Sequence, residues 1–392
     1  MLGRYLALFI PLFLGWGVLS PFLPAVLAEH GASASQVGFL LGIGIGVRLL
    51  AMPLAGALAD RYDAPRQVLA AVLLGAAVAA LLYGLATGFA LLLLVGILHA
   101  AATGPMGPLP DALTVHAAAA GAEGRGPRID YGVVRGAGAA AFIAGSICVG
   151  LAVEQAGTPD IALWLNAGLF GLAAGAALLL PKPASQTSAQ PARAATVPIR
   201  TVLAMPAFRR LLLVSGLIQG SHAFSLGFAV LGWQAAGLTP GTIGWLWSLS
   251  VMAEVLVFFL LGRRLLARLG PAGLCALAGA AGLLRWSMMA LDTSVGIAVL
   301  AQPLHGLTYA GQHLAAMAIL GRIAPDRLAM TAQALHASLG VGLAGALLML
   351  ISGPLYMEYG TGGFWVMAVL SAMAVPLALR LPVADSPAEN AV

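Results

Sequence analysis

Three charged residues, Arg48, Glu254 and Arg285, lie inside long stretches of apolar sequence. A charge near the middle of a bilayer costs roughly 3 kcal/mol, so such a residue usually faces the interior of a helical bundle and has a partner there. A guanidinium can donate two parallel hydrogen bonds to a carboxylate, which makes Arg48 and Arg285 candidates for binding an acidic solute. A carboxylate held away from water takes up a proton readily, so Glu254 is the predicted proton carrier.

Two alternative roles for these charges stay open. A long side chain near a helix end can extend to the membrane surface, although Arg48 and Glu254 lie far from both ends of their stretches. Alternatively, the charges form a salt bridge that holds two helices together without touching solute or proton.

Polar and aromatic residues recur at helical spacing around these charges. Three such stripes are Gln302, His305, Tyr309 and Gln312; Trp247, Ser250 and Glu254; and Gln333, His336 and Gly340. A buried histidine is more often a packing residue than a proton relay. His305 is singled out because it lies on a stripe and has a counterpart in the internal repeat described below.

The composition of this chain indicates whether it folds in water or in a lipid bilayer. Of its 392 residues, 60% are hydrophobic and only 8% are charged, whereas soluble domains carry about 25% charged residues. No soluble fold buries so much apolar surface, so we expect an integral membrane protein. Cys148 and Cys275 lack metal-ligand spacing, and we expect both to be buried free thiols. Patterns typical of enzymes, ATP-driven pumps, cofactor sites and metal sites are not found.

Hydropathy predicts an all-α membrane protein with twelve transmembrane helices in two pseudo-symmetric six-helix bundles. Twelve stretches are long enough to span a bilayer: 5–28, 36–58, 67–86, 89–116, 131–154, 160–180, 208–235, 242–262, 271–290, 295–319, 329–354 and 362–381. The stretch "PKPASQTSAQPARAATVPIR" reads as a flexible linker. The predicted domains are therefore residues 1–180, a cytoplasmic linker 181–206, and residues 207–392.

The basic residues predict the orientation. Apart from Arg48, Arg135 and Arg285, the Lys and Arg residues lie at the two termini, or in or within three residues of the even-numbered loops between the predicted helices. Because cytoplasmic loops are enriched in Lys and Arg, both termini are predicted to be cytoplasmic. This sorting accounts for the net charge of +5 without a nucleic-acid partner. The first apolar stretch is too long for a signal peptide and is read as a spanning helix.

The two predicted halves show a repeat at an offset of 206 residues. The offset pairs Arg48 with Glu254, Trp16 with His222, His99 with His305, Gly38 with Gly244, and Gly56 with Gly262. Paired positions in such a duplication lie across a pseudo-two-fold axis along the membrane normal, and substrate sites form at that interface. We therefore expect Arg48 and Glu254 to lie at equal depth in opposite halves and to face a shared cavity.

The segment "GALADRYDAPR" carries the pattern G-x-x-x-D-R-x-x-x-x-R, formed by Gly56, Asp60, Arg61 and Arg66. This pattern resembles the cytoplasmic motif of the major facilitator superfamily, and the resemblance covers the whole chain. Its glycine permits close helix approach, and its charges are predicted to form a cytoplasmic gate at the membrane surface. The alternative is an ordinary charged turn.

Several further stretches resemble the phenylpropionate permease group within the lactose-permease-like branch of that superfamily. They are "LLGIGIGVRLL", "PLPDAL", "DYGVVRGAGAAAFIAGS", "LLRWSMMA", "AQPLHGLTYAGQHLAAMAIL" and "GFWVMA". The resemblance implies a multi-pass transporter of the bacterial inner membrane that takes up a small organic solute together with protons. It is a weaker guide to the solute than to the fold.

The same resemblance implies roles for individual residues. In lactose permeases an acid of helix 8, an arginine of helix 9 and a histidine of helix 10 act together in proton coupling, and Glu254, Arg285 and His305 are similarly distributed. The chain lacks the second acid that those permeases carry on helix 10, which favours a different proton route. Asp111 and Arg135 would correspond to sugar ligands, but their predicted depth favours a cytoplasmic gate or a structural bridge.

The sequence thus favours a proton-coupled symporter that imports a small aromatic carboxylate by alternating access. The predicted solute-binding residues are Arg48, Arg285, Trp16, His222, Trp247 and Tyr309. An exporter of organic acids or drugs, and a sugar or nucleoside symporter, are alternatives within transport. A non-transporting membrane sensor or assembly partner is the alternative from another class. The expected partners are the solute, protons and the lipid bilayer, and the expected state is a monomer.

Overall fold

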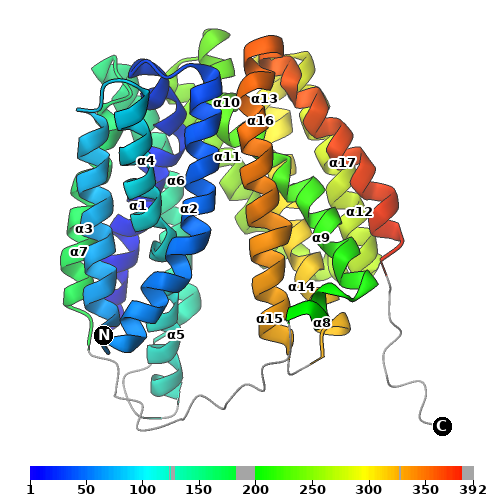
Figure 1. Cartoon of the computed structure of the whole chain (residues 1–392), viewed down its shortest axis with the longest axis horizontal. Coiled ribbons are helices and arrows are strands. Elements are labelled where there is room, and N and C mark those ends of the chain that lie inside the picture. Colours follow the sequence, from blue (N-terminus) through cyan, green and yellow to red (C-terminus); the bar gives the residue numbers. More distant parts are fainter. Residues whose placement is uncertain (123, 125–128, 182–198, 326–327, 382–392) are drawn as a thin grey trace. The chain divides into compact units, whose positions relative to one another are not determined.

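The computed structural model describes residues 1–122, 124, 129–181, 199–325 and 328–381, and these residues form helices and no strand (Figure 1). Most of the predicted linker lies outside the described residues. The chain divides into two compact units. Unit 1 comprises Met1–Gln186, Leu226–Ser248 and Met349–Glu358; unit 2 comprises Thr187–Ser225, Leu249–Leu348 and Tyr359–Val392. The units therefore do not coincide with the two halves of the sequence.

Within the described residues, nine helical segments are long and apolar enough to cross a membrane. Two of them, Pro240–Leu291 and Ala329–Leu379, contain 52 and 51 residues and are each long enough to cross twice. The stretch between them is divided among short helices and falls below the length criterion. Counting it as one crossing gives twelve, as the sequence predicts, and the all-α membrane fold is confirmed.

Unit 1 is built mainly from the helices of the first half of the chain. They are α1 (Leu2–Glu29), α2 (Ala34–Arg61), α3 (Pro65–Tyr83), α4 (Phe89–Thr103), α5 (Pro108–Ala122), α6 (Tyr131–Ala156) and α7 (Ile161–Leu178). The fourth predicted span is divided, because Pro105 and Pro108 lack the amide hydrogen that a continuous helix needs. A single 3₁₀ turn, Gly104–Met106, joins α4 to α5, so Asp111 lies in the first turn of a new helix.

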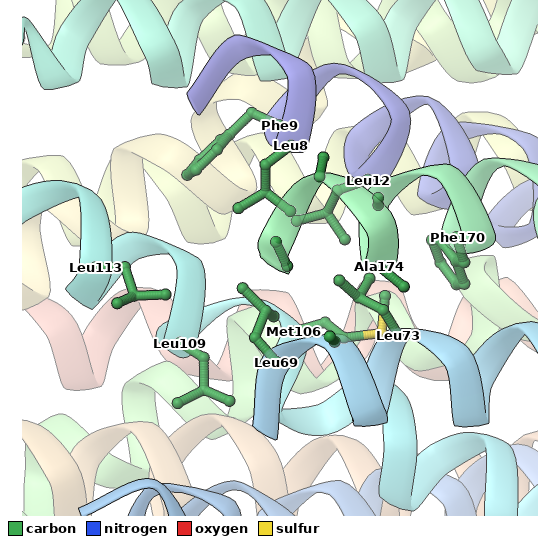
Figure 2. Packing of buried hydrophobic residues seen from close by; sticks show 14 of the residues in the cluster. Leu8, Phe9, Leu12, Leu69, Leu73, Met106, Leu109, Leu113, Phe170 and Ala174 are labelled. Atoms are coloured by element: carbon green, nitrogen blue, oxygen red, sulfur yellow. The ribbon is translucent and has the colours of Figure 1, made fainter. Parts of the chain in front are cut away.

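The core of unit 1 is apolar and lies where α1, α3, α5 and α7 meet. Figure 2 shows residues from these helices packed against one another, among them Leu8, Phe9, Leu12, Leu69, Leu73, Leu109, Leu113, Phe170 and Ala174. The side chains labelled in the figure are buried within unit 1. Cys148, by contrast, is exposed on α6, so the prediction that both cysteines are buried is wrong for it; Cys275 is buried. A cysteine in an apolar helix is buried only where its face of the helix meets another helix.

Helices α1 and α6 approach closely because glycines line their contact. A Cβ atom on Gly17 would lie 2.2 Å from the carbonyl oxygen of Phe142. Pro21 of α1 has no amide hydrogen, so the Gly17 carbonyl, four residues earlier, lacks its helical donor. The Ser146 hydroxyl donates to that carbonyl at 3.1 Å. A proline in α1 is thus accommodated by a polar side chain of the neighbouring helix, as is typical of membrane helices.

Unit 1 is completed by parts of three helices from later in the chain. These helices are α10 (His222–Ala235), α11 (Pro240–Leu256) and α16 (Ala344–Tyr359). The Glu154 carboxylate accepts a hydrogen bond from the Gly241 amide at 2.9 Å, which satisfies a free donor in the first turn of α11. Small residues allow close packing here: a Cβ on Gly38 would lie 2.7 Å from the Gly353 nitrogen.

We expect Gly38→Ala to destabilise the protein, because the added methyl group meets the backbone of α16 and only a helix displacement can relieve the clash. Overpacking of this kind costs about 1–3 kcal/mol, which outweighs the gain in helix propensity from alanine. Thermal unfolding of purified protein in detergent measures the effect. Gly46→Ala on the same helix is the matched control, since a Cβ at Gly46 meets open space; equal melting temperatures for the two variants would contradict the prediction.

Unit 2 contains the remaining helices. They are α8 (Ile199–Leu203), α9 (Pro206–Gly220), α12 (Gly262–Leu291), α13 (Val295–Ala301), α14 (Gln312–Ile323), α15 (Ala329–Leu335) and α17 (Phe364–Leu379). Its apolar core includes Phe208, Leu274, Ala316 and Ala374. Within α12, Gly270 has φ of 66° and ψ of 171° and kinks the helix before Pro271. The kink separates the two spans that the sequence predicts on either side of it.

Three π-helical turns interrupt the helices of unit 2. They are Val257–Leu261, Gly306–Gly311 and His336–Leu343. Each begins at or within three residues of a buried or half-buried titratable side chain: Glu254, His305 or His336. The stripe predicted along 302–312 assumed a regular α-helix, and this assumption is wrong, because a 3₁₀ turn and a π turn lie within it. π-Helical turns are rare and frequently occur at functional sites.

Candidate functional site

A cavity of about 520 Å³ lies in unit 1, and Arg48 contributes to its wall. Arg48 is midway along α2, whose 28 residues are enough to cross a bilayer. The other polar residues that line the cavity include Tyr83, His99, Thr103 and Asn166. The volume is in the range typical of small-molecule binding sites, roughly 300–1,000 Å³.

The position of Arg48 depends on close contact between α2 and the end of α4. A Cβ atom on Gly104 would lie 3.1 Å from the Cα of Arg48, so glycine there allows the two backbones to approach. The Arg48 Nε–H donates to the Thr103 hydroxyl oxygen at 3.3 Å. That hydroxyl in turn donates to the His99 carbonyl at 2.8 Å. The stem of Arg48 is therefore held by a single hydrogen bond to a fixed neighbour.

The two terminal nitrogens of Arg48 form no hydrogen bond or ion pair with the described residues, and they belong to a side chain that lines the cavity. His99 Nε2 and Asn166 Oδ1 are buried and have no described partner either. Buried polar groups normally have hydrogen-bond partners, and a cationic group inside a membrane normally has an anionic one. The Arg48 guanidinium in this wall thus offers free donors to an anion, whereas Asn166 Oδ1 offers an acceptor to a donor group of a solute.

The rest of the cavity wall is mainly apolar and aromatic. Trp16, Phe142 and Phe170 line it, together with Leu23 and Met52 among others. Trp16 is held by an edge-to-face contact with the Phe13 ring, with the ring centroids 5.0 Å apart. A free guanidinium in an aromatic cavity is complementary to a solute that carries one carboxylate on an apolar body.

A second polar cluster lies in unit 2 around Arg285, which is only 2% exposed. Its Nη1 donates to His305 Nδ1 at 2.9 Å, and its Nη2 donates to Gln302 Oε1 at 3.1 Å. The guanidinium also lies over the Trp286 ring, 4.4 Å from its centroid. Arg285 is thus oriented by contacts on α12 and on the segment after α13.

These contacts fix the protonation pattern of His305. Because Arg285 can only donate, His305 Nδ1 accepts and the ring hydrogen lies on Nε2. That Nε2 lies 3.5 Å from Glu254 Oε2, within ion-pair distance of the carboxylate. The three residues form one chain in which a guanidinium, an imidazole and a carboxylate are connected.

Thr308 connects this chain to a second histidine. His222 Nδ1 lies 3.1 Å from the carbonyl oxygens of Ile218 and Gln219 and must donate to them. His222 Nε2 therefore accepts from the Thr308 hydroxyl, 2.9 Å away. The ring of His222 is also 5.2 Å from the His305 ring. Both histidines are neutral in this arrangement. In each ring, the nitrogen without a hydrogen already accepts a hydrogen bond.

The structure separates the predicted solute-binding residues into two groups. Trp16 and Arg48 line the cavity of unit 1. His222, Arg285 and Tyr309 belong to the cluster of unit 2, where the Tyr309 ring stacks on His305 at 5.4 Å. The guanidinium of Arg285 donates to side chains of its own unit, and its role in solute binding stays a prediction.

Trp247 lies in unit 1 but is not among the described residues that line the cavity. Its side chain is buried. The shared cavity that we expect between Arg48 and Glu254 also stays a prediction, since these residues belong to different units.

The predicted gate residues form two kinds of contact. Arg135 Nη1 lies 3.8 Å from Asp111 Oδ1, and the Arg135 guanidinium lies over the Phe13 ring. These two contacts connect α6 with α5 and with α1. Arg66 donates to the Leu178 carbonyl at the end of α7, where free carbonyls attract positive charge.

Within the described residues, Asp60 and Arg61 form no ion pair, and the Arg61 guanidinium lies 5.8 Å from the centroid of the Tyr62 ring. Whether the motif acts as a gate stays a prediction.

Four residues of these sites were not singled out from the sequence. Tyr83, Thr103 and Asn166 line the cavity, and Thr308 joins the two histidines. Asn166 is the only amide in its apolar stretch, and this could have identified it. A threonine inside a membrane helix usually bonds to its own helix, so Thr103 and Thr308 carried no comparable signal.

Comparisons with known proteins agree with the fold and the family. A family model described as "MFS_1 like family" matches residues 4–367. The chain is 30% identical over 377 residues to the "Probable 3-phenylpropionic acid transporter" of Escherichia coli (strain K12), with 95% of this chain and 96% of that protein covered. It is 26% identical over 373 residues to the "Maltose permease" of Geobacillus stearothermophilus, with 94% and 91% covered.

Two solved structures share the arrangement of helices. The nucleoside transporter NupG has a TM-score of 0.82 at 17% identity, with 96% of this chain and 97% of that chain covered. A bacterial homologue of the human lysosomal transporter Spinster has a TM-score of 0.69 at 14% identity, with 97% and 96% covered. Identities this low show the fold alone. The family match and the 30% relative confirm the resemblance inferred from the sequence, and the chain is a secondary transporter that belongs to the MFS_1 like family of the major facilitator superfamily.

Proposed function

We propose that this protein imports a small aromatic carboxylate together with protons across the bacterial inner membrane, with both termini in the cytoplasm. The observation that carries the proposal is Arg48, whose terminal guanidinium nitrogens have no partner among the described residues and belong to the wall of an aromatic cavity in unit 1. Such a guanidinium is available to a carboxylate solute, which can accept two parallel hydrogen bonds from it. The relative described as a probable 3-phenylpropionic acid transporter supports this class of solute.

The proton would bind in unit 2. Glu254 lies within ion-pair distance of His305, which accepts a hydrogen bond from Arg285. The charge of the carboxylate therefore acts on both of these groups. Protonation of Glu254 removes a negative charge from the cluster, and the part of the chain that the structure describes provides no other acidic side chain paired with the buried Arg285 guanidinium. Binding or loss of the proton therefore changes the free energy of unit 2 substantially, which is what coupling to a conformational change requires.

The solute class is tested by the affinity of purified protein for matched ligands. We expect 3-phenylpropionate to bind about 100-fold more tightly than 3-phenylpropanol, because the alcohol lacks the charge that Arg48 would neutralise, a difference of about 3 kcal/mol. Isothermal titration calorimetry in detergent measures both affinities. A sugar or nucleoside symporter is the competing function, and the maltose permease relative supports including such solutes. Binding of maltose or a nucleoside with no binding of the acid would overturn the carboxylate assignment.

A further inference from the structure

The side-chain amide of Asn166 on α7 has one polar atom with a partner and one without. Its Nδ2 donates to the Gly15 carbonyl oxygen of α1 at 2.8 Å. A carbonyl oxygen can only accept, so this bond fixes which end of the amide is the nitrogen. The other end, Oδ1, is buried and has no described partner, although buried acceptors normally have one. The residue is fully buried and lines the cavity of unit 1.

Close packing of α7 on α1 holds this amide in place. A Cβ atom on Gly15 would lie 2.6 Å from the Phe170 ring, so glycine there lets the ring lie against α1. Phe170 follows Asn166 by one turn of α7 and lines the same cavity, as does Trp16 of α1. The free oxygen of Asn166 thus belongs to a part of the wall that also carries two aromatic rings.

Arg48 lies at a similar depth on a different pair of helices. It is fourteen residues from the start of α2 at Ala34, and Gly15 is fourteen residues from the end of α1 at Glu29. Since the two helices join at that end, both positions are about 21 Å from it. Arg48 bonds to α4, whereas Asn166 bonds to α1. Because both residues line one cavity, a single solute can meet the guanidinium with one group and the amide oxygen with another.

The free oxygen restricts the kind of group that can bind to it. An amide oxygen accepts hydrogen bonds and cannot donate, so its ligand must carry an N–H or an O–H group. The described residues that line the cavity include the cation Arg48 and no Asp or Glu. An ammonium group would therefore be buried near a like charge without a counter-ion, which is strongly unfavourable. A neutral hydroxyl group can donate the hydrogen bond without that cost.

We propose that Asn166 is a specificity-determining residue and that the preferred solute carries a hydroxyl group on its aromatic ring in addition to its carboxylate. The carboxylate binds the Arg48 guanidinium, the ring lies beside Trp16 and Phe170, and the ring hydroxyl donates to Asn166 Oδ1. A hydroxyl at ring position 3 or 4 points away from the propionate chain, as two separate contacts require. This inference deepens the proposed function and rests on it, since it assumes a carboxylate solute held by Arg48.

A purely structural role for Asn166 is the alternative, because polar side chains such as Asn stabilise contacts between membrane helices. In that role only the bond to Gly15 matters. The two roles differ in a measurable way. A structural disturbance of the cavity changes the affinity for acids with and without a ring hydroxyl alike, whereas loss of a direct hydrogen bond weakens the binding of the hydroxylated acid alone.

The first test compares ligands on wild-type protein by isothermal titration calorimetry in detergent. We expect at least one of 3-(3-hydroxyphenyl)propionate and 3-(4-hydroxyphenyl)propionate to bind about ten-fold more tightly than 3-phenylpropionate, because the unsubstituted ring leaves Asn166 Oδ1 without a donor. The methyl ether of that acid keeps the oxygen but has no hydrogen to donate, so it should bind no more tightly than 3-phenylpropionate. Equal affinities for the hydroxy acid and its methyl ether would overturn the inference.

The second test replaces the acceptor. Asn166→Leu has a similar shape but no polar atom, and we expect it to bind 3-phenylpropionate within about two-fold of wild type while losing the preference for the hydroxylated acid. Ser146→Ala is the matched control, because the Ser146 hydroxyl also donates to a carbonyl of α1, that of Gly17, but Ser146 is not among the described residues that line the cavity. This control should keep the preference. A preference that persists in Asn166→Leu would exclude Asn166 as the acceptor.

The comparison on wild type also distinguishes the two possible failures. Binding of 3-phenylpropionate with no gain from either ring hydroxyl would overturn this inference and leave the proposed function standing. Absence of binding by all of these acids would overturn both. Because these results need no variant, they decide the question even if Asn166→Leu does not fold.

Discussion

Arg48→Gln is expected to weaken the binding of 3-phenylpropionate about 100-fold. The variant keeps a side chain of similar polarity but removes the charge and the paired N–H donors. Truncating one partner of a buried charge pair costs roughly 2–5 kcal/mol, and about 3 kcal/mol corresponds to about two orders of magnitude in Kd. The Thr103 hydroxyl, which accepts from Arg48 Nε, would lose only a minor contact. Isothermal titration calorimetry on wild type and variant in the same detergent measures the difference.

Two further variants make this result specific. Arg48→Lys keeps the positive charge but not the planar fork, so we expect an intermediate loss of about ten-fold. Arg4→Gln removes an exposed charge from α1 and should leave the affinity unchanged. An Arg48→Gln protein that is folded and binds the acid as tightly as wild type would exclude Arg48 as the carboxylate ligand. The melting temperature of each variant establishes that it is folded.

Glu254→Gln is expected to abolish accumulation of solute driven by a pH gradient, while solute exchange across the membrane continues. The glutamine side chain has nearly the same shape and keeps an oxygen acceptor near His305 Nε2, so we expect the cluster around Arg285 to keep its geometry. It has no titratable proton, so it resembles the protonated carboxyl and cannot cycle between two charge states. Proteoliposomes loaded with unlabelled solute measure exchange, and empty proteoliposomes with an imposed gradient measure accumulation.

Glu358→Gln is the matched control for Glu254→Gln, because Glu358 is exposed near the end of α16. It should accumulate solute like wild type. Undiminished gradient-driven accumulation by Glu254→Gln would remove Glu254 from the coupling role. Loss of both accumulation and exchange would instead indicate that the variant is arrested, and His305→Gln would then show whether the arrest arises from the contacts among Glu254, His305 and Arg285.

The repeat in the sequence could predict that the two polar sites are built from corresponding helices of the two halves. The offset of 206 residues places Arg48 and Glu254 on corresponding helices, and His99 and His305 on another corresponding pair. In unit 1, Arg48 bonds to Thr103, one turn after His99; in unit 2, Glu254 is next to His305. Duplicated bundles share the packing of helices against one another, so equal positions in the sequence have equivalent neighbours.

The local breaks in the helices were only partly predictable. The prolines at Pro105 and Pro108 are visible in the sequence, and they divide the fourth span. The π turns at Gly306–Gly311 and His336–Leu343 are not visible, because one extra residue in a turn leaves the apolar composition unchanged. Such a turn changes the direction of the residues that follow it, and Gln312, the first residue after the turn at Gly306–Gly311, donates to Ser215.

Hydropathy by itself determined that this chain is a helical membrane protein with twelve spans. The isolated charges indicated candidate sites, because a charge inside a bilayer is costly. The tertiary structure decided which of these charges are free. Among the described residues, the terminal nitrogens of Arg48 are unpaired at a cavity, whereas both terminal nitrogens of Arg285 donate to His305 and Gln302. Pairing depends on side chains from helices distant in the sequence, and the spacing of residues along one helix does not determine it.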